Sequence, residues 1–216
     1  MKCCFMKALI GMVLLAVPNV LAQDKALYHQ DFEKEEIGKL PAGFLVLDGA
    51  FSVKEEKGNK FLELPGSPLD TFAVQFGPAD ADNISVSASI CATAKGRRFP
   101  VFGIGLNGIA GYRLQASPAK NAIELFKDQT LKATIPYDWK SGAWLNLRLQ
   151  VQRAQDGFWK VDGKVWPKGS AEPQQWMIHV DDKEQPLAGR ASIFGSPFSG
   201  TPIQFDDLKV DNASRE

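Results

Sequence analysis

The chain has 216 residues and carries 25 lysines and arginines against 25 aspartates and glutamates, so its net charge is close to zero. Nucleic acids and anionic membrane surfaces are bound by clustered Lys and Arg. This charge balance therefore disfavours both as partners. The length is sufficient for one domain with a single large core, and all-β domains commonly reach this size undivided.

The first 22 residues have the pattern of a signal peptide. Lys2 and Lys7 form a basic start, residues 8–17 an apolar run, and Val20-Leu21-Ala22 precedes a predicted cut before Gln23. The alternative is an uncleaved anchor, but a membrane span needs about 20 apolar residues and this run is shorter. We therefore expect an exported protein, periplasmic or extracellular, without a membrane span.

The mature chain is predicted to form one domain at 23–212, followed by a frayed tail at 213–216. Cys3 and Cys4 precede the apolar run, whereas a lipid-modified cysteine would stand directly after the cut. Cys91 is then the only mature cysteine, so no internal disulfide can form. Because no histidine lies near it in sequence, we interpret Cys91 as a small strand residue and not as a nucleophile.

Short segments of alternating apolar and polar residues follow one another from residue 44 onwards. The clearest are 84–90 and 145–152, in which every second residue is apolar. Sheets with one dry and one wet face are typically antiparallel. Further strands are predicted at 44–47, 51–54, 60–64, 72–76, 176–180, 191–194 and 203–210.

Three connections have the chemistry of hairpin turns. They are Asn107-Gly108, Lys127-Asp128-Gln129 and Asp156-Gly157, and each lies between two predicted strands. The strand after the third turn runs through Trp159, Val161 and Val165. So many short, evenly spaced strands indicate an all-β sandwich or barrel, with helix limited to a turn or two outside the leader.

The last predicted strand changes phase before Leu208, which predicts a β-bulge at Asp206 and Asp207. If the terminal strands pair, Asp31 would lie near these two acids. Clustered carboxylate oxygens suit Ca²⁺, so Asp31, Asp206 and Asp207 are candidate ligands of a structural calcium ion. The other interpretation is solvated acids at a turn, because no loop of calcium-binding spacing is present.

Several segments together carry a family resemblance that spans nearly the whole mature chain. The chain resembles exported bacterial proteins with a laminin-G-like or concanavalin-A-like jelly roll. The resemblance implies two large antiparallel sheets packed face to face, a curved sheet that often carries a sugar-binding surface, and in many members one structural Ca²⁺. The segments are Asp31-Phe32-Glu33, Leu40-Pro41, Trp144-Leu145-Asn146-Leu147-Arg148, Lys164-Val165-Trp166-Pro167-Lys168-Gly169, Glu172-Pro173, Trp176 and Phe205-Asp206-Asp207-Leu208-Lys209-Val210.

The chain departs from the enzymes of that family. Laminarinase-type glycoside hydrolases place Glu-x-Asp-x-Glu on one strand, so that the carboxylates share a face. The sequence has no such triplet, and its acidic runs at 33–36, 181–184 and 206–207 lie in loops or at strand ends. It is also similar to exported hydrolases or lyases of 3-keto-sugars in its sandwich and closing strand, but their internal motifs are absent.

Other catalytic and metal sites find little support. His29 and His179 are far apart, and there is no Gly-x-Ser-x-Gly elbow or zinc-ligand spacing. Gly103 and Gly105 lie in a hairpin pattern and do not open a helix, which argues against a nucleotide site.

The remaining candidate for function is a surface. If Trp159 and Val161 point into the core, alternation places Lys164 and Trp166 on the outward face. Arg148 shares that face if the predicted strand at 145–152 pairs with the strand through Trp159. An aromatic ring among long polar groups is how proteins hold sugars. The alternative is that Trp166 lies under the 167–173 loop as scaffold, with Lys164 or Arg148 as a cation–π neighbour.

Trp176 and Tyr112 complete the candidate ligand-binding set, whereas Trp144 is interpreted as core cover. Three hypotheses follow from the sequence. The first is a non-catalytic carbohydrate-binding protein with exposed aromatic residues on a sheet. The second is an enzyme acting on glycosides or 3-keto-glycosides. The third is a cell-envelope interaction protein, marked by a filled sheet face and an apolar edge.

Overall fold

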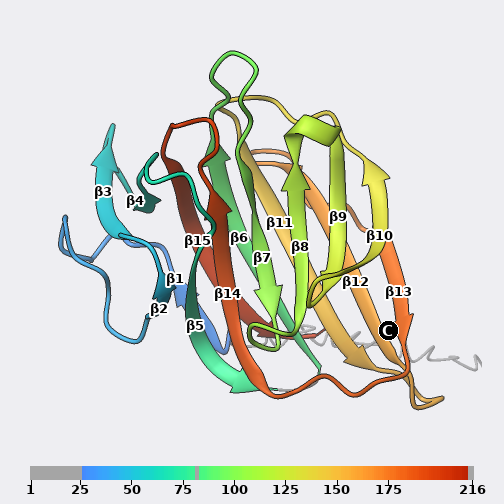
Figure 1. The fold of residues 1–216 in the computed structure, drawn as a ribbon. Helices are drawn as coiled ribbons and strands as arrows, with labels where there is room; N and C mark the ends of the chain where they lie inside the picture. Colours follow the sequence, from blue (N-terminus) through green and yellow to red (C-terminus); the bar gives the residue numbers. More distant parts are fainter. Residues whose placement is uncertain (1–25, 81–82, 214–216) are drawn as a thin grey trace, which may run out of the picture.

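A computed structural model describes residues 26–80 and 83–213 and shows two antiparallel sheets packed face to face (Figure 1). The one helical element among these residues is a 3₁₀ turn, η1, at Pro118–Lys120. The strands are β1 (Tyr28–Gln30), β2 (Leu45–Asp48), β3 (Ser52–Glu56), β4 (Asn59–Leu64), β5 (Phe72–Asp80), β6 (Ile84–Ala92), β7 (Val101–Leu106), β8 (Tyr112–Ser117), β9 (Ala122–Lys127), β10 (Thr130–Pro136), β11 (Trp144–Arg153), β12 (Trp159–Pro167), β13 (Ile178–Asp182), β14 (Gly189–Ser196) and β15 (Ile203–Asn212).

The strand order has the crossovers of a jelly roll. One sheet has eight strands in the order β13-β12-β11-β6-β15-β4-β3, with β1 also paired to β15. The other has seven in the order β10-β9-β8-β7-β14-β5-β2. The all-β sandwich predicted from the sequence is therefore confirmed.

The alternating segments form the core as predicted. Apolar residues of β6 and β11 are buried between the sheets, and their polar neighbours point away from the core. Gly163 of β12 also faces inward, because a Cβ there would lie 2.8 Å from the Leu114 side chain of the opposite sheet. The close approach of the two layers at this point requires glycine.

The predicted turns and the bulge are also present. Asn107, Gly108, Asp128 and Gly157 all have positive φ, as hairpin turns of this kind require. The register of β15 against β6 shifts between Asp206 and Lys209, where Asp207 has φ 50°. The bulge is therefore confirmed.

Two elements were not predicted, β1 and η1. Strand β1 has three residues, too few to show alternation, and it pairs with the end of β15. The predicted signal peptide and residues 214–216 lie outside the described residues. Ala213, placed in the predicted frayed tail, is buried and donates its N–H to the Asn83 carbonyl at 2.8 Å. The described part contains no helix long and apolar enough to span a membrane.

Candidate functional site

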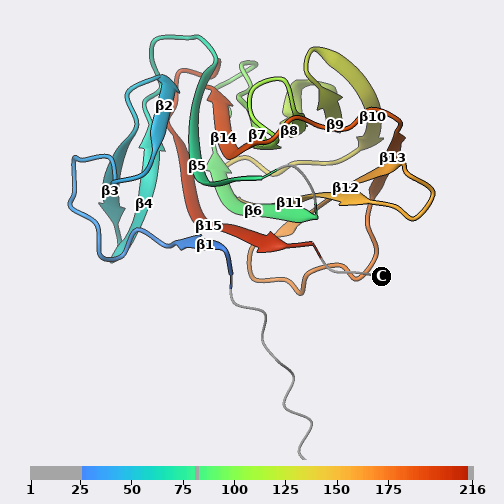
Figure 2. The same cartoon turned by 90° about the horizontal axis from the view of Figure 1, so that it is seen from below.

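The outer face of the eight-stranded sheet, which points away from the core, carries polar residues from β6, β11, β12 and β15. The sequence pattern predicts that this face is wet, yet many of its side chains are buried, among them Ser89, Gln150 and Asp162. The loop between β12 and β13, drawn in orange in Figure 2, runs across this face. We call residues 168–177 the cover loop.

Under the cover loop, two cations of the sheet converge on one carboxylate. Glu172 lies 2.7 Å from Lys164 Nζ and 3.0 Å from Arg148 Nη1. Lys164 also donates to the Pro173 carbonyl at 2.8 Å and sits 4.4 Å from the centroid of the Trp176 ring. The loop is thus fastened to the sheet by ionic, hydrogen-bond and cation–π contacts to the same lysine.

The electrostatics of this contact favour a charged Glu172. Burial raises the pKa of its carboxyl, but the hydrogen bond from Lys164 and the charge of Arg148 outweigh burial and hold the pKa below its ordinary value. Glu172, Pro173 and Trp176, which are among the segments that carry the family resemblance, therefore attach the loop to the sheet. We call the part of the outer face around Lys164 and Arg148, which lies under Glu172, Pro173 and Trp176 of the cover loop, the covered half.

Of the two interpretations of Trp166, the structure fits the scaffold residue and not the exposed aromatic plate. The ring lies on the predicted outer face, since Trp166 pairs with Asn146 as Lys164 pairs with Arg148, but only 9% of the residue is exposed. Lys164 stacks on Trp176 and not on Trp166. Lys164 and Arg148 do share one face, as predicted, and Trp176 lies against Lys164 from the cover loop. The role of these three residues in ligand binding stays a prediction.

The placement of Tyr112 on a binding surface is also wrong. Tyr112 is fully buried, and its hydroxyl donates to the Asp182 carboxylate at 3.0 Å. Lys127 pairs with the same carboxylate, also at 3.0 Å. Because Tyr112 and Lys127 come from the seven-stranded sheet and Asp182 from β13 of the other, this cluster joins the two sheets along one side of the sandwich.

The three predicted calcium ligands are not assembled around a common point. Lys168 Nζ lies 3.2 Å from Asp206 Oδ2 and 2.8 Å from Asp207 Oδ2, so one ammonium group bridges the two acids and offsets one of their two charges. Strands β1 and β15 pair as expected, but the Asp31 carboxylate accepts the Glu33 N–H. Within the described residues no group of three or more His, Cys, Asp or Glu could hold a metal ion. These residues do not fit Ca²⁺.

Beyond the covered half, the same face is open. A pocket of about 400 Å³ is lined by Glu56, Lys57, Asn59, Phe61, Cys91, Gly142, Trp144, Lys168 and Gln204. We call it the Trp144 pocket. Its volume lies in the range of small-molecule sites, roughly 300–1,000 Å³. Its residues come from the β3–β4 hairpin, from β6, β11 and β15, and from the start of the cover loop.

Two aromatic rings give the Trp144 pocket an apolar wall. Trp144 is half-buried, and its ring meets that of the buried Phe61 edge-on, with the centroids 6.2 Å apart. Lys168 Nζ lies 4.9 Å from the Trp144 centroid. The amides of Asn59 and Gln204 add groups that both donate and accept hydrogen bonds. An aromatic surface beside amides is suited to a hydroxylated ring.

Sequence reasoning missed this pocket, although a signal for it was present. Trp144 directly precedes Leu145, so the alternation of β11 places its ring on the outer face. Phe61 likewise precedes the inward Leu62 of β4. The interpretation of Trp144 as core cover was therefore wrong: it covers the outer face and lines a pocket.

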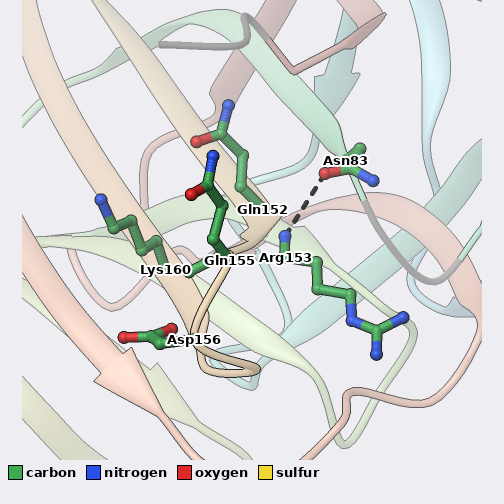
Figure 3. Close-up of a pocket in the computed structure, with 7 residues that line it drawn as sticks. Asn83, Gln152, Arg153, Gln155, Asp156 and Lys160 are labelled. Carbon is green, nitrogen blue, oxygen red and sulfur yellow. Dashed lines mark hydrogen bonds between the residues drawn. The ribbon is translucent and has the colours of Figure 1, made fainter.

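A second, larger pocket of about 720 Å³ lies beside the β11–β12 hairpin (Figure 3). Its lining is mostly polar. Gln152, Gln155, Asp156 and Lys160 come from the hairpin, and Asn83 directly precedes β6. None of the described residues that line it is aromatic. It therefore lacks the apolar plate that the Trp144 pocket provides.

The outer face of the seven-stranded sheet is filled by its own side chains. The Arg113 guanidinium lies between the rings of Phe126 and Phe194, at 5.4 and 5.6 Å from their centroids. The buried Glu124 is bonded by Ser117 and Lys120. Burial raises the pKa of Glu124, yet these bonds hold it below its ordinary value. This acid is accordingly a poor proton donor at neutral pH.

No protein-family model matches the sequence, and no curated protein matches it significantly. Solved structures do match. The carbohydrate-binding module CBM66 from Bacillus subtilis is 11% identical, with a TM-score of 0.55 over 78% of this chain and 95% of that one. The Emp46p carbohydrate recognition domain in its metal-free form is 9% identical, with a TM-score of 0.55 over 88% and 95%.

Domain 4 of AbnA, an extracellular arabinanase from Geobacillus stearothermophilus solved with arabinotriose, is 13% identical, with a TM-score of 0.52 over 89% of this chain and 95% of that domain. These similarities show the fold alone. The chain shares its jelly-roll sandwich, consistent with the concanavalin-A-like type, with domains described as carbohydrate-binding. The Emp46p domain is also known in a potassium-bound form.

Proposed function

We propose that this protein is an exported, non-catalytic carbohydrate-binding β-sandwich and that the Trp144 pocket is its sugar site. The observation that carries the proposal is the half-buried Trp144 ring beside Phe61 and two amides in an open pocket. Stacking on a sugar C–H face and bonding to hydroxyls are what such a pocket supplies. The leader-like sequence and the carbohydrate-binding domains of the same fold support the proposal.

The alternative, a glycoside hydrolase, needs two carboxylates flanking the sugar, separated by about 5 Å in retaining and up to about 9.5 Å in inverting enzymes. Of the nine described residues that line the pocket, Glu56 is the one acid, and it is paired with Lys57 at 3.2 Å. Asp206 and Asp207 lie behind Lys168 and are bound to it. The arrangement suits holding a sugar better than cleaving its bond.

The test is a glycan-array screen followed by calorimetric titration of the strongest ligand. Trp144→Ala should weaken binding about 30-fold, which corresponds to about 2 kcal/mol for an aromatic anchor. Trp176→Ala is the matched control, since it removes a tryptophan of the same face that lies over Lys164 in the covered half. We expect it to change the affinity less than about threefold.

Two further measurements keep the outcome unambiguous. The first is Gln204→Ala, which removes a pocket amide but no aromatic ring and should by itself weaken glycan binding. The second is thermal melting of each variant, which identifies any loss of folding. If Trp144→Ala and wild type bind the same glycan with equal affinity, the Trp144 pocket is not the sugar site. If the wild type binds no glycan on the array, the proposed carbohydrate-binding function is wrong.

A second candidate function, protein association, is supported by strand β2. Besides the three-residue β1, four described strands lie at a sheet edge. Of these, β13 carries acids and β10 carries Lys132, Pro136 and a bulge, which discourage pairing with another chain. Val53 of β3 exchanges backbone hydrogen bonds with residues 38–39. Leu45, Val46 and Leu47 of β2, in contrast, are apolar and between 38% and 50% exposed, although β2 also has a register shift between Val46 and Asp48. An apolar strand of a partner protein would pair here.

The association proposal is tested with a second copy of the chain as the strand donor. A charged residue on an edge strand blocks pairing, so Val46→Lys should dissociate any dimer seen by light scattering at about 100 μM, where a contact with a Kd near 10 μM would be about 80% formed. A wild type that is monomeric there, or a dimer unchanged by Val46→Lys, would count against a role for β2 in self-association.

A further inference from the structure

Both lysines of the Trp144 pocket are already neutralised by acids of the same protein. Lys57 pairs with Glu56 at 3.2 Å at the β3–β4 turn. Lys168 binds Asp206 and Asp207 at 3.2 and 2.8 Å. Three carboxylates therefore surround two ammonium groups, which leaves the pocket and its inner wall with a net charge of about −1.

Lys168 is held firmly in this arrangement. Burial lowers the pKa of its ammonium group, but the hydrogen bond to Asp207 and the charge of Asp206 outweigh burial and raise it. Asp206 is buried and also accepts a hydrogen bond from Asn59 at 3.3 Å. Moving Lys168 towards an incoming anion would leave the Asp206 charge without its partner in a buried position, which is strongly unfavourable.

A further acid stands behind the pocket amide of Gln204. Glu63 lies opposite Gln204 in the β4–β15 pairing and bonds to its side chain. Burial raises the pKa of Glu63, whereas the nearby charge of Lys54 lowers it, so this acid and this lysine together leave the net charge beside the pocket at about −1. A ligand carboxylate or sulfate would thus meet repulsion without gaining an unpaired cation.

Resting on the proposed function, we infer that the Trp144 pocket selects neutral sugars and rejects uronic, sialylated and sulfated ones. The ligand contacts available are the Trp144 ring, which packs on the buried Phe61, and the amides of Asn59 and Gln204. All of these recognise C–H faces and hydroxyl groups and carry no charge. Selectivity comes from the negative wall, which penalises an anionic ring that would otherwise stack equally well.

The test compares two sets of oligosaccharides of equal length on the full chain. The neutral set contains β-glucan, mannan, xylan and arabinan hexamers, and the acidic set contains polygalacturonate and alginate hexamers. We expect the best neutral ligand to bind at least about tenfold more tightly than any acidic one. Its affinity should change less than about twofold between roughly 20 and 500 mM NaCl, because no net charge is brought together.

A charge variant sharpens the result. Glu56→Gln removes an exposed pocket acid and frees Lys57, so the ratio of the neutral to the acidic affinity should fall, whatever the change in neutral binding itself. Tighter binding of the acidic set, weakened by salt, would overturn the inference and leave the proposed function standing. If the protein binds neither set of oligosaccharides, both the inferred selectivity and the proposed carbohydrate-binding function are wrong.

Discussion

The covered and open halves of one sheet face use the same ingredients differently. In the covered half Lys164 lies 4.4 Å from the Trp176 centroid, and in the open half Lys168 lies 4.9 Å from that of Trp144. Glu172 and Pro173 cover Lys164, whereas the pocket around Trp144 remains open. A contact between a tryptophan and a lysine, one on the outer sheet face and the other on the cover loop, is therefore compatible with either scaffold or site, and the path of the loop decides.

The covered half should matter for stability and not for binding. Lys164→Met removes the cation that holds Glu172, Pro173 and Trp176, and it should lower the free energy of unfolding by about 3 kcal/mol. That value is near the low end for a broken buried pair, because the Glu172 side chain is 36% exposed. Urea denaturation measures the loss.

The matched control is Lys34→Met, at an exposed lysine, which should change stability by less than about 0.5 kcal/mol. Glycan affinity of the folded Lys164→Met protein should stay within about twofold of wild type. A loss of stability below about 1 kcal/mol, or a large loss of affinity with intact folding, would contradict the division between the two halves.

The fastening in the covered half should depend on pH. The pKa of Glu172 is lower in the folded protein than its ordinary value near 4.3. Its contribution is therefore complete above the unfolded pKa and is lost as the pH falls through the folded one. Compared with Glu172→Gln, wild type should be more stable by roughly 1 kcal/mol at pH 7.

That advantage should shrink as the pH falls from about 5 to 3. Glu124 and Asp182 also have lowered pKa values, but they are present in both proteins and cancel in the difference. Denaturant midpoints of the pair, collected across this range, provide the measurement. An advantage that stays constant or grows on acidification would show that the charge of Glu172 does not hold the loop.

The smallest effect concerns metal. Because Lys168 occupies the position between Asp206 and Asp207, adding about 5 mM Ca²⁺ or excess EDTA should move the melting temperature by less than about 1 °C, since a bound ligand would raise it. A rise of several degrees with Ca²⁺, reversed by EDTA, would restore the calcium ion that the family resemblance implies.

The sandwich itself could be predicted because dyad alternation and turn residues are local signals. Strand β11 needed no tertiary information, and the phase change before Leu208 located the bulge correctly. Strand β1 was missed because its three residues are defined by pairing with β15 and not by their own pattern.

The site was predicted less well, for a physical reason. Alternation gives the side to which Trp166 points, but the 9% exposure of this residue depends on a loop whose path has no periodic signal. The role of Lys168 as counter-ion of Asp206 and Asp207 depends on contacts between residues 38 or more positions apart. Trp144 and Phe61, in contrast, could have been placed on the outer face from the phase of their own strands.

The most direct test follows the indole N–H signals of the five tryptophans by NMR while a bound oligosaccharide is titrated into the ¹⁵N-labelled protein. Assignment uses single Trp→Phe variants. The signal of Trp144 should shift with the binding curve, while those of Trp166 and Trp176 stay in place. A stationary Trp144 signal together with saturable shifts at Trp176 would locate the ligand in the covered half and contradict the account.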